Sequence, residues 1–195
     1  MLLGKRKDRV LYRHKKTDGF SLIELLVVIA IIGILGGMAV VYFRDSKKRV
    51  RVVIARVAIS DIKGAMIRME TYTGEWPGHQ IPWQMCPPSL CGDNEVWDLN
   101  SESAGLTQND PGNPFSGWQG PYLDSVPLDP WGKPYFLDTD YRVQAGTDNP
   151  CGVPQKFPCD LVAAIGSFGP NRYGPNRYDD DDIIFVLAGK RDWTD

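Results

Sequence analysis

The sequence predicts an α+β fold, in which a long N-terminal α-helix is packed by a small antiparallel β-sheet of three or four short strands. The first 75 of the 195 residues contain no proline and no tryptophan, whereas all 15 prolines and all 6 tryptophans follow them. The charge divides at nearly the same point, since residues 1–76 carry a net charge of +8 and residues 77–195 one of −10. This division excludes collagen-like and wholly disordered chains, and the acidic half argues against nucleic-acid binding.

A basic leader and an apolar run open the chain. Residues 1–19 contain seven Lys or Arg and two acidic residues, and residues 20–43 form a run of 24 residues in which Glu24 is the single charge. About 20 apolar helical residues cross the hydrocarbon core of a bilayer, so this run is predicted to span a membrane once. The leader is expected to keep the N-terminus in the cytoplasm, although basic residues between positions 44 and 51 weaken that bias.

Helical periodicity continues beyond the apolar run. Apolar residues recur at steps of three and four between positions 50 and 72, which is typical of one face of an amphipathic helix. Because no proline precedes Pro77, one helix is predicted from about residue 22 to about residue 73, ended by the Thr-Gly-Glu-Trp-Pro-Gly of residues 73–78. The predicted organisation is a leader (1–19), an apolar helix (20–43), an amphipathic helix (44–76) and a loop-rich β domain (77–195).

Residues 19–30, Gly-Phe-Ser-Leu-Ile-Glu-Leu-Leu-Val-Val-Ile-Ala, resemble the class III signal of type IV pilins and type II secretion pseudopilins. The resemblance implies that a membrane peptidase removes the leader by cutting between Gly19 and Phe20. It implies that the new amino group is then N-methylated while the apolar helix stays on the mature chain. It also implies that Glu24 is the counter-charge for the free amino terminus of a neighbouring subunit. The alternative is a carboxylate that lies at the membrane interface and pairs with no other subunit.

Residues 120–123 (Gly-Pro-Tyr-Leu) and 127–135 (Pro-Leu-Asp-Pro-Trp-Gly-Lys-Pro-Tyr) closely resemble a segment of the major pseudopilin of type II secretion. In physical terms, Asp-Pro and Trp-Gly predict a turn, and the aromatic residues predict a hairpin that packs on the helix. A catalytic role for Asp129 is the alternative. The two histidines of the chain lie at positions 14 and 79, and no second carboxylate is spaced to assist Asp129, so no enzymatic activity is expected.

Residues 78–119 are predicted to form a loop, with a short helix expected near residues 95–104. The four cysteines indicate an oxidised, extracytoplasmic portion. They allow three pairings, of which the two local bridges, Cys86–Cys91 and Cys151–Cys159, are favoured. Their spacings do not match those of the usual zinc sites.

Residues 160–165 and 183–187 are predicted to form the last two strands. Between them the pentapeptide Gly-Pro-Asn-Arg-Tyr occurs twice and is followed by four aspartates. Such hard oxygen ligands suit Ca²⁺, which takes six to eight of them. The resemblance also implies one calcium ion in this loop, and matching the residues to the family pattern gives as ligands Ser167, Asn171, Asp180 and Asp182.

The loop departs from the family pattern at two positions. Asn171 stands where the family has an aspartate, and Arg172 stands where the family has a glycine. The alternative to a calcium site is therefore a solvated acidic loop, or one whose aspartates pair with Arg172 and Arg177.

The resemblance implies a structural subunit of a type II secretion pseudopilus, a helical filament that assembles from the inner membrane to drive protein export. The first alternative is a type IV pilin of a surface filament for adhesion, motility or DNA uptake, and the second is a membrane-tethered binding module. The expected partners are further copies of the chain, the prepilin peptidase and N-methyltransferase, the inner-membrane assembly platform, minor pseudopilins and membrane lipid. The expected location is the inner membrane, crossed once, with the C-terminal domain in the periplasm and the filament in the periplasm or at the cell surface.

Overall fold

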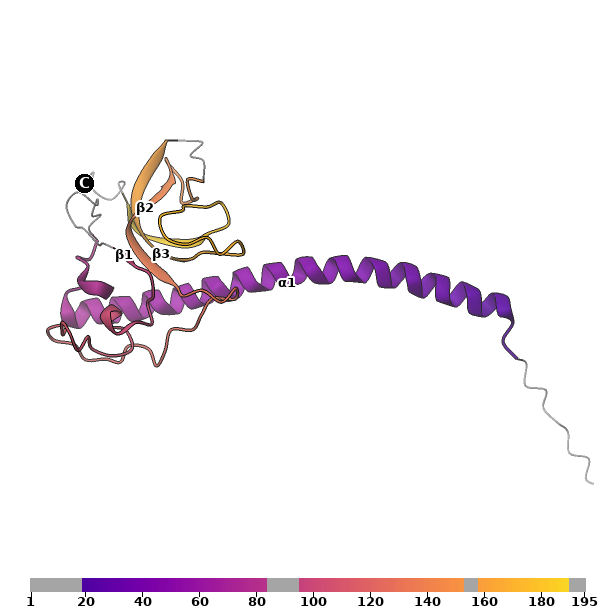
Figure 1. Ribbon diagram of the computed structural model, residues 1–195, viewed down its shortest axis with the longest axis horizontal. Helices are drawn as coiled ribbons and strands as arrows, with labels where there is room; N and C mark the ends of the chain where they lie inside the picture. Colours follow the sequence, from indigo (N-terminus) through magenta and orange to yellow (C-terminus); the bar gives the residue numbers. More distant parts are fainter. Residues whose placement is uncertain (1–18, 84–94, 153–157, 190–195) are drawn as a thin grey trace, which may run out of the picture. The chain divides into compact units, whose positions relative to one another are not determined.

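A computed structural model describes residues 19–83, 95–152 and 158–189, without the side chains of residues 39–41 and 44 (Figure 1). It confirms the predicted α+β fold, in which a long helix precedes a four-stranded antiparallel sheet of order β1-β2-β3-β4. The elements in chain order are α1 (Leu22–Thr73), η1 (Pro77–His79), β1 (Glu95–Val96), η2 (Glu102–Ala104), β2 (Phe136–Gln144), β3 (Cys159–Ser167) and β4 (Ile183–Gly189).

Helix α1 is helical over the 52 residues that the sequence predicts. The chain divides into two compact units at residues 45 and 46, so α1 contributes to both. In the first unit the described apolar side chains are exposed, as at Leu22 (88%) and Ile23 (71%). Among the described residues no helix is long and apolar enough to cross a membrane, so the membrane span stays a prediction.

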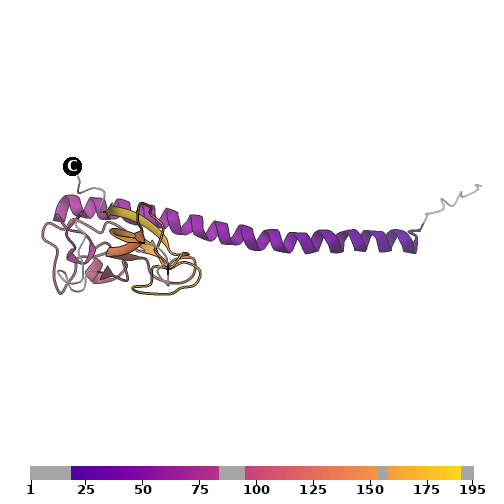
Figure 2. The same ribbon diagram turned by 90° about the horizontal axis from the view of Figure 1, so that it is seen from above.

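The second unit has its core between α1 and the sheet, which lies alongside the C-terminal part of the helix (Figure 2). The buried helix residues recur at steps of three and four, as the amphipathic pattern predicts, and are Ala55, Ile59, Ile62, Ala65, Met66 and Met69. They pack with Trp76, Leu99, Leu106, Leu137 and Ile165, each at most 2% exposed. Burial of these apolar side chains is the main source of the stability of the unit.

Both faces of the sheet are apolar. Leu137 and Ile165, paired across β2 and β3, face the helix core, whereas their neighbours Phe136 and Ala164 belong to a second cluster. Side chains alternate between the two faces of a strand, so this second cluster covers the face away from α1. Phe168 belongs to this second cluster, and the partly buried rings of Trp97 and Tyr178 pack against it.

The predicted strands at residues 160–165 and 183–187 are confirmed as parts of β3 and β4. The prediction of a short helix near residues 95–104 is wrong. Residues 95–96 form β1, and residues 102–104 form a single 3₁₀ turn. Pairing of Glu95 and Val96 with Asp138 and Leu137 of β2 overrides the weak local preference for helix.

Candidate functional site

The start of α1 is fixed by a capping box between Ser21 and Glu24. The Glu24 carboxylate Oε2 accepts hydrogen bonds from the Ser21 backbone N–H (2.8 Å) and the Ser21 hydroxyl (2.9 Å). The Glu24 N–H donates in return to Ser21 Oγ at 3.3 Å. This reciprocal arrangement satisfies backbone donors that the first turn of a helix leaves free. Glu24 therefore has a structural partner within its own chain.

The predicted processing site precedes this cap. Gly19 and Phe20 are both exposed, with 82% of Phe20 accessible, and Leu22 is the first helical residue. The peptide bond between them is thus outside the helix. Cleavage at this bond, N-methylation and the counter-charge role of Glu24 stay predictions.

Asp129 is the buried centre of a turn. Its Oδ1 accepts the backbone N–H groups of Trp131 (2.9 Å) and Lys133 (2.8 Å), and its Oδ2 accepts the Ser167 hydroxyl at 2.6 Å. The side chain is 4% exposed. Asp129 thus closes the Asp-Pro-Trp-Gly turn and ties it to the end of β3, which is a structural role. Beside this carboxylate, burial and then the Asp129 charge raise the pKa of Tyr135 to about 12.

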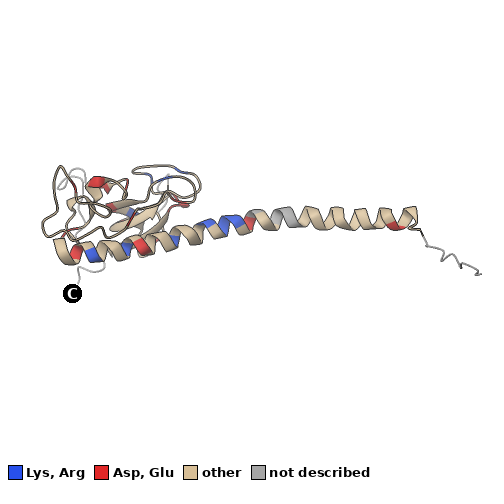
Figure 3. Cartoon of the chain, turned by 90° about the horizontal axis from the view of Figure 1, so that it is seen from below, with Lys and Arg blue, Asp and Glu red and all other residues tan. Residues whose placement is uncertain are grey.

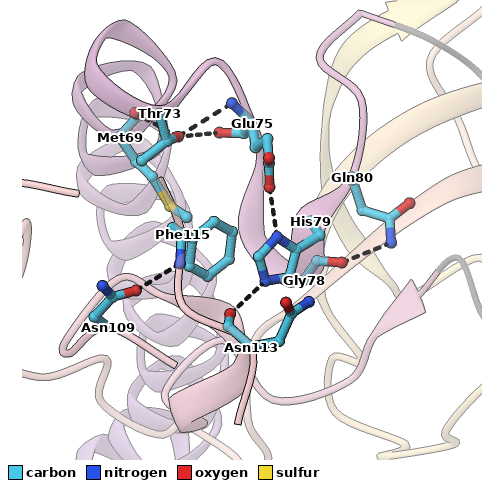
Figure 4. Close-up of polar contacts among 9 residues, drawn as sticks. All are labelled: Met69, Thr73, Glu75, Gly78, His79, Gln80, Asn109, Asn113 and Phe115. Atoms are coloured by element: carbon cyan, nitrogen blue, oxygen red, sulfur yellow. Dashed lines mark hydrogen bonds and ion pairs between the residues drawn. The ribbon is translucent and has the colours of Figure 1, made fainter. Parts of the chain in front are cut away.

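The C-terminal end of α1 is held by a polar cluster around His79 (Figure 4). His79 Nδ1 lies 2.5 Å from Glu75 Oε2, and its Nε2 lies 2.8 Å from the Asn113 carbonyl oxygen. The ring stacks on Phe115 with 3.8 Å between centroids. Because both ring nitrogens face acceptors, the ring makes both bonds only when each nitrogen carries a proton. The cluster joins the helix end to the loop at residues 109–115.

The predicted calcium ligands have separate partners in the structure. Ser167 donates to Asp129, as described above. The Asn171 backbone N–H and side-chain amide donate to Asp181, and Asp182 Oδ2 accepts the Tyr141 hydroxyl at 2.7 Å. Asp180 lies beside Gly152, where an added Cβ would stand 2.9 Å from Asp180 Oδ1. The described residues contain no group of three or more His, Cys, Asp or Glu side chains arranged to hold a metal ion.

Some carboxylate oxygens of the domain are buried and accept no hydrogen bond. Asp182 is 7% exposed, and its Oδ1 has no partner; Asp179 Oδ2 next to it is in the same state. On β2, Asp138 Oδ2 and Asp140 Oδ1 are also without partners, in residues that are 1% and 5% exposed. A buried carboxylate oxygen without a hydrogen-bond partner makes the charged form of its group costly.

Burial and then the neighbouring Asp140 carboxyl raise the pKa of Asp138 to about 8, whereas the hydrogen bond from the Asp140 backbone N–H lowers it. Burial likewise raises the pKa of Asp182 to about 7, although the Tyr141 hydrogen bond opposes this. Asp138 and Asp140 are not among the site residues predicted from the sequence. The signal was two acidic residues at alternate positions, 138 and 140, directly after the apolar Phe136 and Leu137, because alternate positions of a strand lie on one face.

We expect the free energy of unfolding of the domain to fall as the pH rises from about 4, the ordinary pKa of an aspartate, to about 8. In this interval the folded state holds protons on Asp138 and Asp182 that the unfolded chain has lost, so stability falls with pH. The total change should be on the order of a few kcal/mol, since one pKa unit corresponds to about 1.4 kcal/mol.

Urea unfolding of the full chain in detergent, followed by tryptophan fluorescence, measures this dependence, because every tryptophan lies after residue 75. The Asp138→Asn variant should flatten the curve, whereas the exposed Asp124→Asn is the control and should not. Stability that rises steadily from about pH 4 to about pH 8 would contradict the assignment.

The structure contains the disulfide Cys151–Cys159, with 6.1 Å between the Cα atoms, as one of the two favoured pairings predicts. Cys151 is 2% exposed. The adjacent Gly152 N–H donates to the Tyr178 carbonyl at 2.7 Å, so the bridged loop packs against the acidic loop. The predicted pair Cys86–Cys91 lies outside the described residues.

Comparison with known families gives two matches on this chain. Residues 14–40 match the prokaryotic N-terminal methylation motif, and residues 99–148 match protein G of the type II secretion system. The first match contains the predicted processing site and the Ser21–Glu24 cap. The second contains the Asp129 turn and all of β2.

Curated relatives fall into two groups. The chain is 26% identical over 123 residues to type II secretion system core protein G of Pseudomonas aeruginosa, covering 63% of this chain and 74% of the relative. It is 27% identical to the protein of the same name from Aeromonas hydrophila, over 64% of this chain and 75% of the relative. A fimbrial protein of Neisseria meningitidis serogroup B is 41% identical over 61 residues, which are 31% of this chain and 36% of that protein. No solved structure gives a significant match.

Proposed function

We propose that this chain, which belongs to the major pseudopilins of the type IV pilin-like superfamily, is a structural subunit of a type II secretion pseudopilus. The observation that carries the proposal is the turn around the buried Asp129, which lies within the segment that matches protein G. The protein G relatives also match over most of the chain, whereas the fimbrial protein matches over about a third of its own length. A surface pilin is thus the less supported alternative.

The subunit acts by assembling, and we propose no catalytic step for it. The supporting surface is an exposed apolar stripe on α1, formed by Val50, Val53, Ile54 and Val57, which are 52–59% exposed. At about 100° per residue the stripe lies roughly opposite the buried helix residues, so it is free to pack on another subunit. Contacts of this kind between copies are heterologous and extend into a helical filament. The remaining expected partners are the prepilin peptidase, the assembly platform and minor pseudopilins.

We also propose that residues 20–43 anchor the chain in the inner membrane, with the domain in the periplasm. The support is the sequence, a 24-residue run in which Glu24 is the single charge. The described side chains of this run are exposed. The Cys151–Cys159 bridge fits an oxidising compartment such as the periplasm.

Deleting the gene in its own cell tests the function. Secreted proteins should then accumulate inside the cell, and the intact gene should restore their export. Normal export together with lost surface filaments would instead support the alternative of a surface pilin.

For the acidic loop we propose a calcium site centred on Asp182. The support is the Asp182 Oδ1 oxygen, which is buried without a hydrogen-bond partner, beside Asp179 Oδ2 in the same state. Calcium would neutralise the carboxylates that burial makes costly. Ser167 and Asn171 have other partners, so the site has to be completed by oxygens other than theirs, or by rearrangement of the loop.

We expect the domain to melt at a higher temperature in calcium than in chelator. An ion that binds only the folded state stabilises it by about 2.7 kcal/mol at 100 times its dissociation constant. Magnesium should substitute poorly because it requires a smaller octahedral site. The Asp182→Ala variant should abolish the difference, and the control Asp124→Ala should keep it. Equal melting temperatures in calcium, magnesium and chelator would overturn the calcium proposal alone.

A further inference from the structure

The first turns of α1 in the second unit carry a basic segment, defined as residues 47–56. It contains no acidic residue, and its five basic side chains are all exposed: Lys47, Lys48, Arg49, Arg51 and Arg56. Figure 3 shows these cations as the blue part of the helix. The single ion pair among the described residues joins His79 and Glu75, and the described cation–π contacts use Lys63, Arg142 and Arg177. The cations of the basic segment are therefore unpaired.

The arrangement of these cations is unfavourable for an isolated subunit. Lys47 and Arg51 are four residues apart, and Lys48 and Arg51 three apart, so like charges are neighbours on the helix surface. At about 100° per residue the five cations cover about 200° of the circumference, and the exposed Val50, Val53, Ile54 and Val57 lie on the remainder. Basic residues next to a membrane helix are usually concentrated on its cytoplasmic side, so a strongly basic segment on the exported side is also unfavourable. An anionic partner would offset both costs.

The position of the basic segment indicates where that partner lies. It begins four residues after the apolar run ends at Phe43. Lys47 to Arg51 extend about 6 Å along a helix, which matches a head-group layer of about 5–8 Å on each side of the hydrocarbon core. Lysine and arginine side chains can reach the phosphates from such positions, while the exposed valines on the remaining face of the helix can contact the acyl boundary.

We propose that the basic segment binds the phosphates of anionic phospholipid head groups at the periplasmic surface of the membrane. This inference rests on the proposed membrane anchor. The lipid neutralises the basic segment while the subunit is in the membrane, before assembly. The lipid must then be released when neighbouring subunits replace the membrane around the helix. Asp181 and Asp182 of a second copy are less suited as partners, because Asp182 is buried and accepts the Tyr141 hydroxyl and Asp181 accepts hydrogen bonds from Asn171.

Native mass spectrometry of the full mature chain tests this inference, with the protein released from micelles that contain equal amounts of phosphatidylglycerol and phosphatidylcholine. The wild-type chain should retain at least tenfold more phosphatidylglycerol. The Lys47→Gln/Arg51→Gln variant should lower this ratio at least threefold, and adding Lys48→Gln and Arg49→Gln should bring it close to one. The matched control Arg172→Gln/Arg177→Gln removes two exposed cations from the domain and should leave the ratio unchanged.

Equal retention of the two lipids by the wild-type chain would overturn the inference, as would the same loss of preference in the control variant. Complete competition by millimolar glycerol phosphate would also overturn it, because the basic segment would then bind free phosphate and not a lipid surface. Filament assembly, measured on the same proteins, reports separately on the proposed function. A wild-type chain that assembles but shows no preference for phosphatidylglycerol overturns only the lipid inference.

Discussion

Replacing Glu24 with alanine should leave a stable membrane protein that no longer forms filaments. The carboxylate lies four residues after the predicted new amino terminus and is exposed in the single chain. In a filament core, a buried amino group and a buried carboxylate would each be costly alone, and pairing them between subunits offsets both costs. We expect at least a tenfold loss of filaments, measured by shearing and quantifying pelleted fibres. The urea unfolding curve of the domain should not change.

The capping box supplies the control for this experiment. Alanine removes both the charge of Glu24 and its hydrogen bonds to Ser21, whereas glutamine removes the charge and still fits a capping box. Glu24→Gln should therefore fail to assemble as severely as Glu24→Ala. If Glu24→Gln assembles like the wild type, the counter-charge role is wrong and Glu24 acts by capping its own helix.

Replacing Asp129 with alanine should lower the free energy of unfolding of the domain by about 3–5 kcal/mol. Three donors lose their acceptor at once: the backbone N–H groups of Trp131 and Lys133, and the Ser167 hydroxyl. The Ser167 hydroxyl is buried and the two backbone donors are partly buried, and a buried donor left without a partner costs about 1–3 kcal/mol. Urea unfolding followed by tryptophan fluorescence measures the loss, since all six tryptophans lie after residue 75.

Two milder variants separate the contributions of this turn. Asp129→Asn keeps an acceptor for the two backbone donors and should cost about 1 kcal/mol. Ser167→Ala removes one hydrogen bond, together with the group that donates it, and should cost a similar amount. A loss below about 1 kcal/mol for Asp129→Ala would show that the turn does not depend on its carboxylate.

The long helix was predictable because its determinants are local. An apolar run, a three- and four-residue period and the first proline at position 77 are properties of neighbouring residues, and α1 ends at Thr73 as they indicate. The Ser-x-x-Glu of residues 21–24 also carried a capping signal. Glu24 was interpreted from the sequence as a contact between subunits or as a carboxylate at the membrane interface, and not as a hydrogen-bond partner of Ser21.

The sheet was only partly predictable. Strands β3 and β4 are apolar enough to be recognised alone, whereas β1 has two residues and forms because β2 offers it a partner. Such a short strand leaves no period in the sequence.

The site depended still more on long-range contacts. The hydrogen bond between Asp129 and Ser167 joins residues 38 positions apart. Ser167, a predicted calcium ligand, therefore has a buried partner in the domain instead. The stack of His79 on Phe115 and the burial of Asp138 likewise arise only after folding. The spacing of residues in the sequence could suggest ligand types for the acidic loop. It could not show which of these oxygens are hydrogen-bonded to other groups in the folded domain.

Mass spectrometry of the N-terminus of the chain, purified from filaments of its own cell, tests the central claim most directly. A pseudopilus subunit should begin at Phe20, with one methyl group on its amino nitrogen, and should lack residues 1–19. A control with Gly19 replaced by a bulky residue, Gly19→Leu, should keep its leader and form no filaments. A chain that begins at Met1 in its working form would contradict the claim.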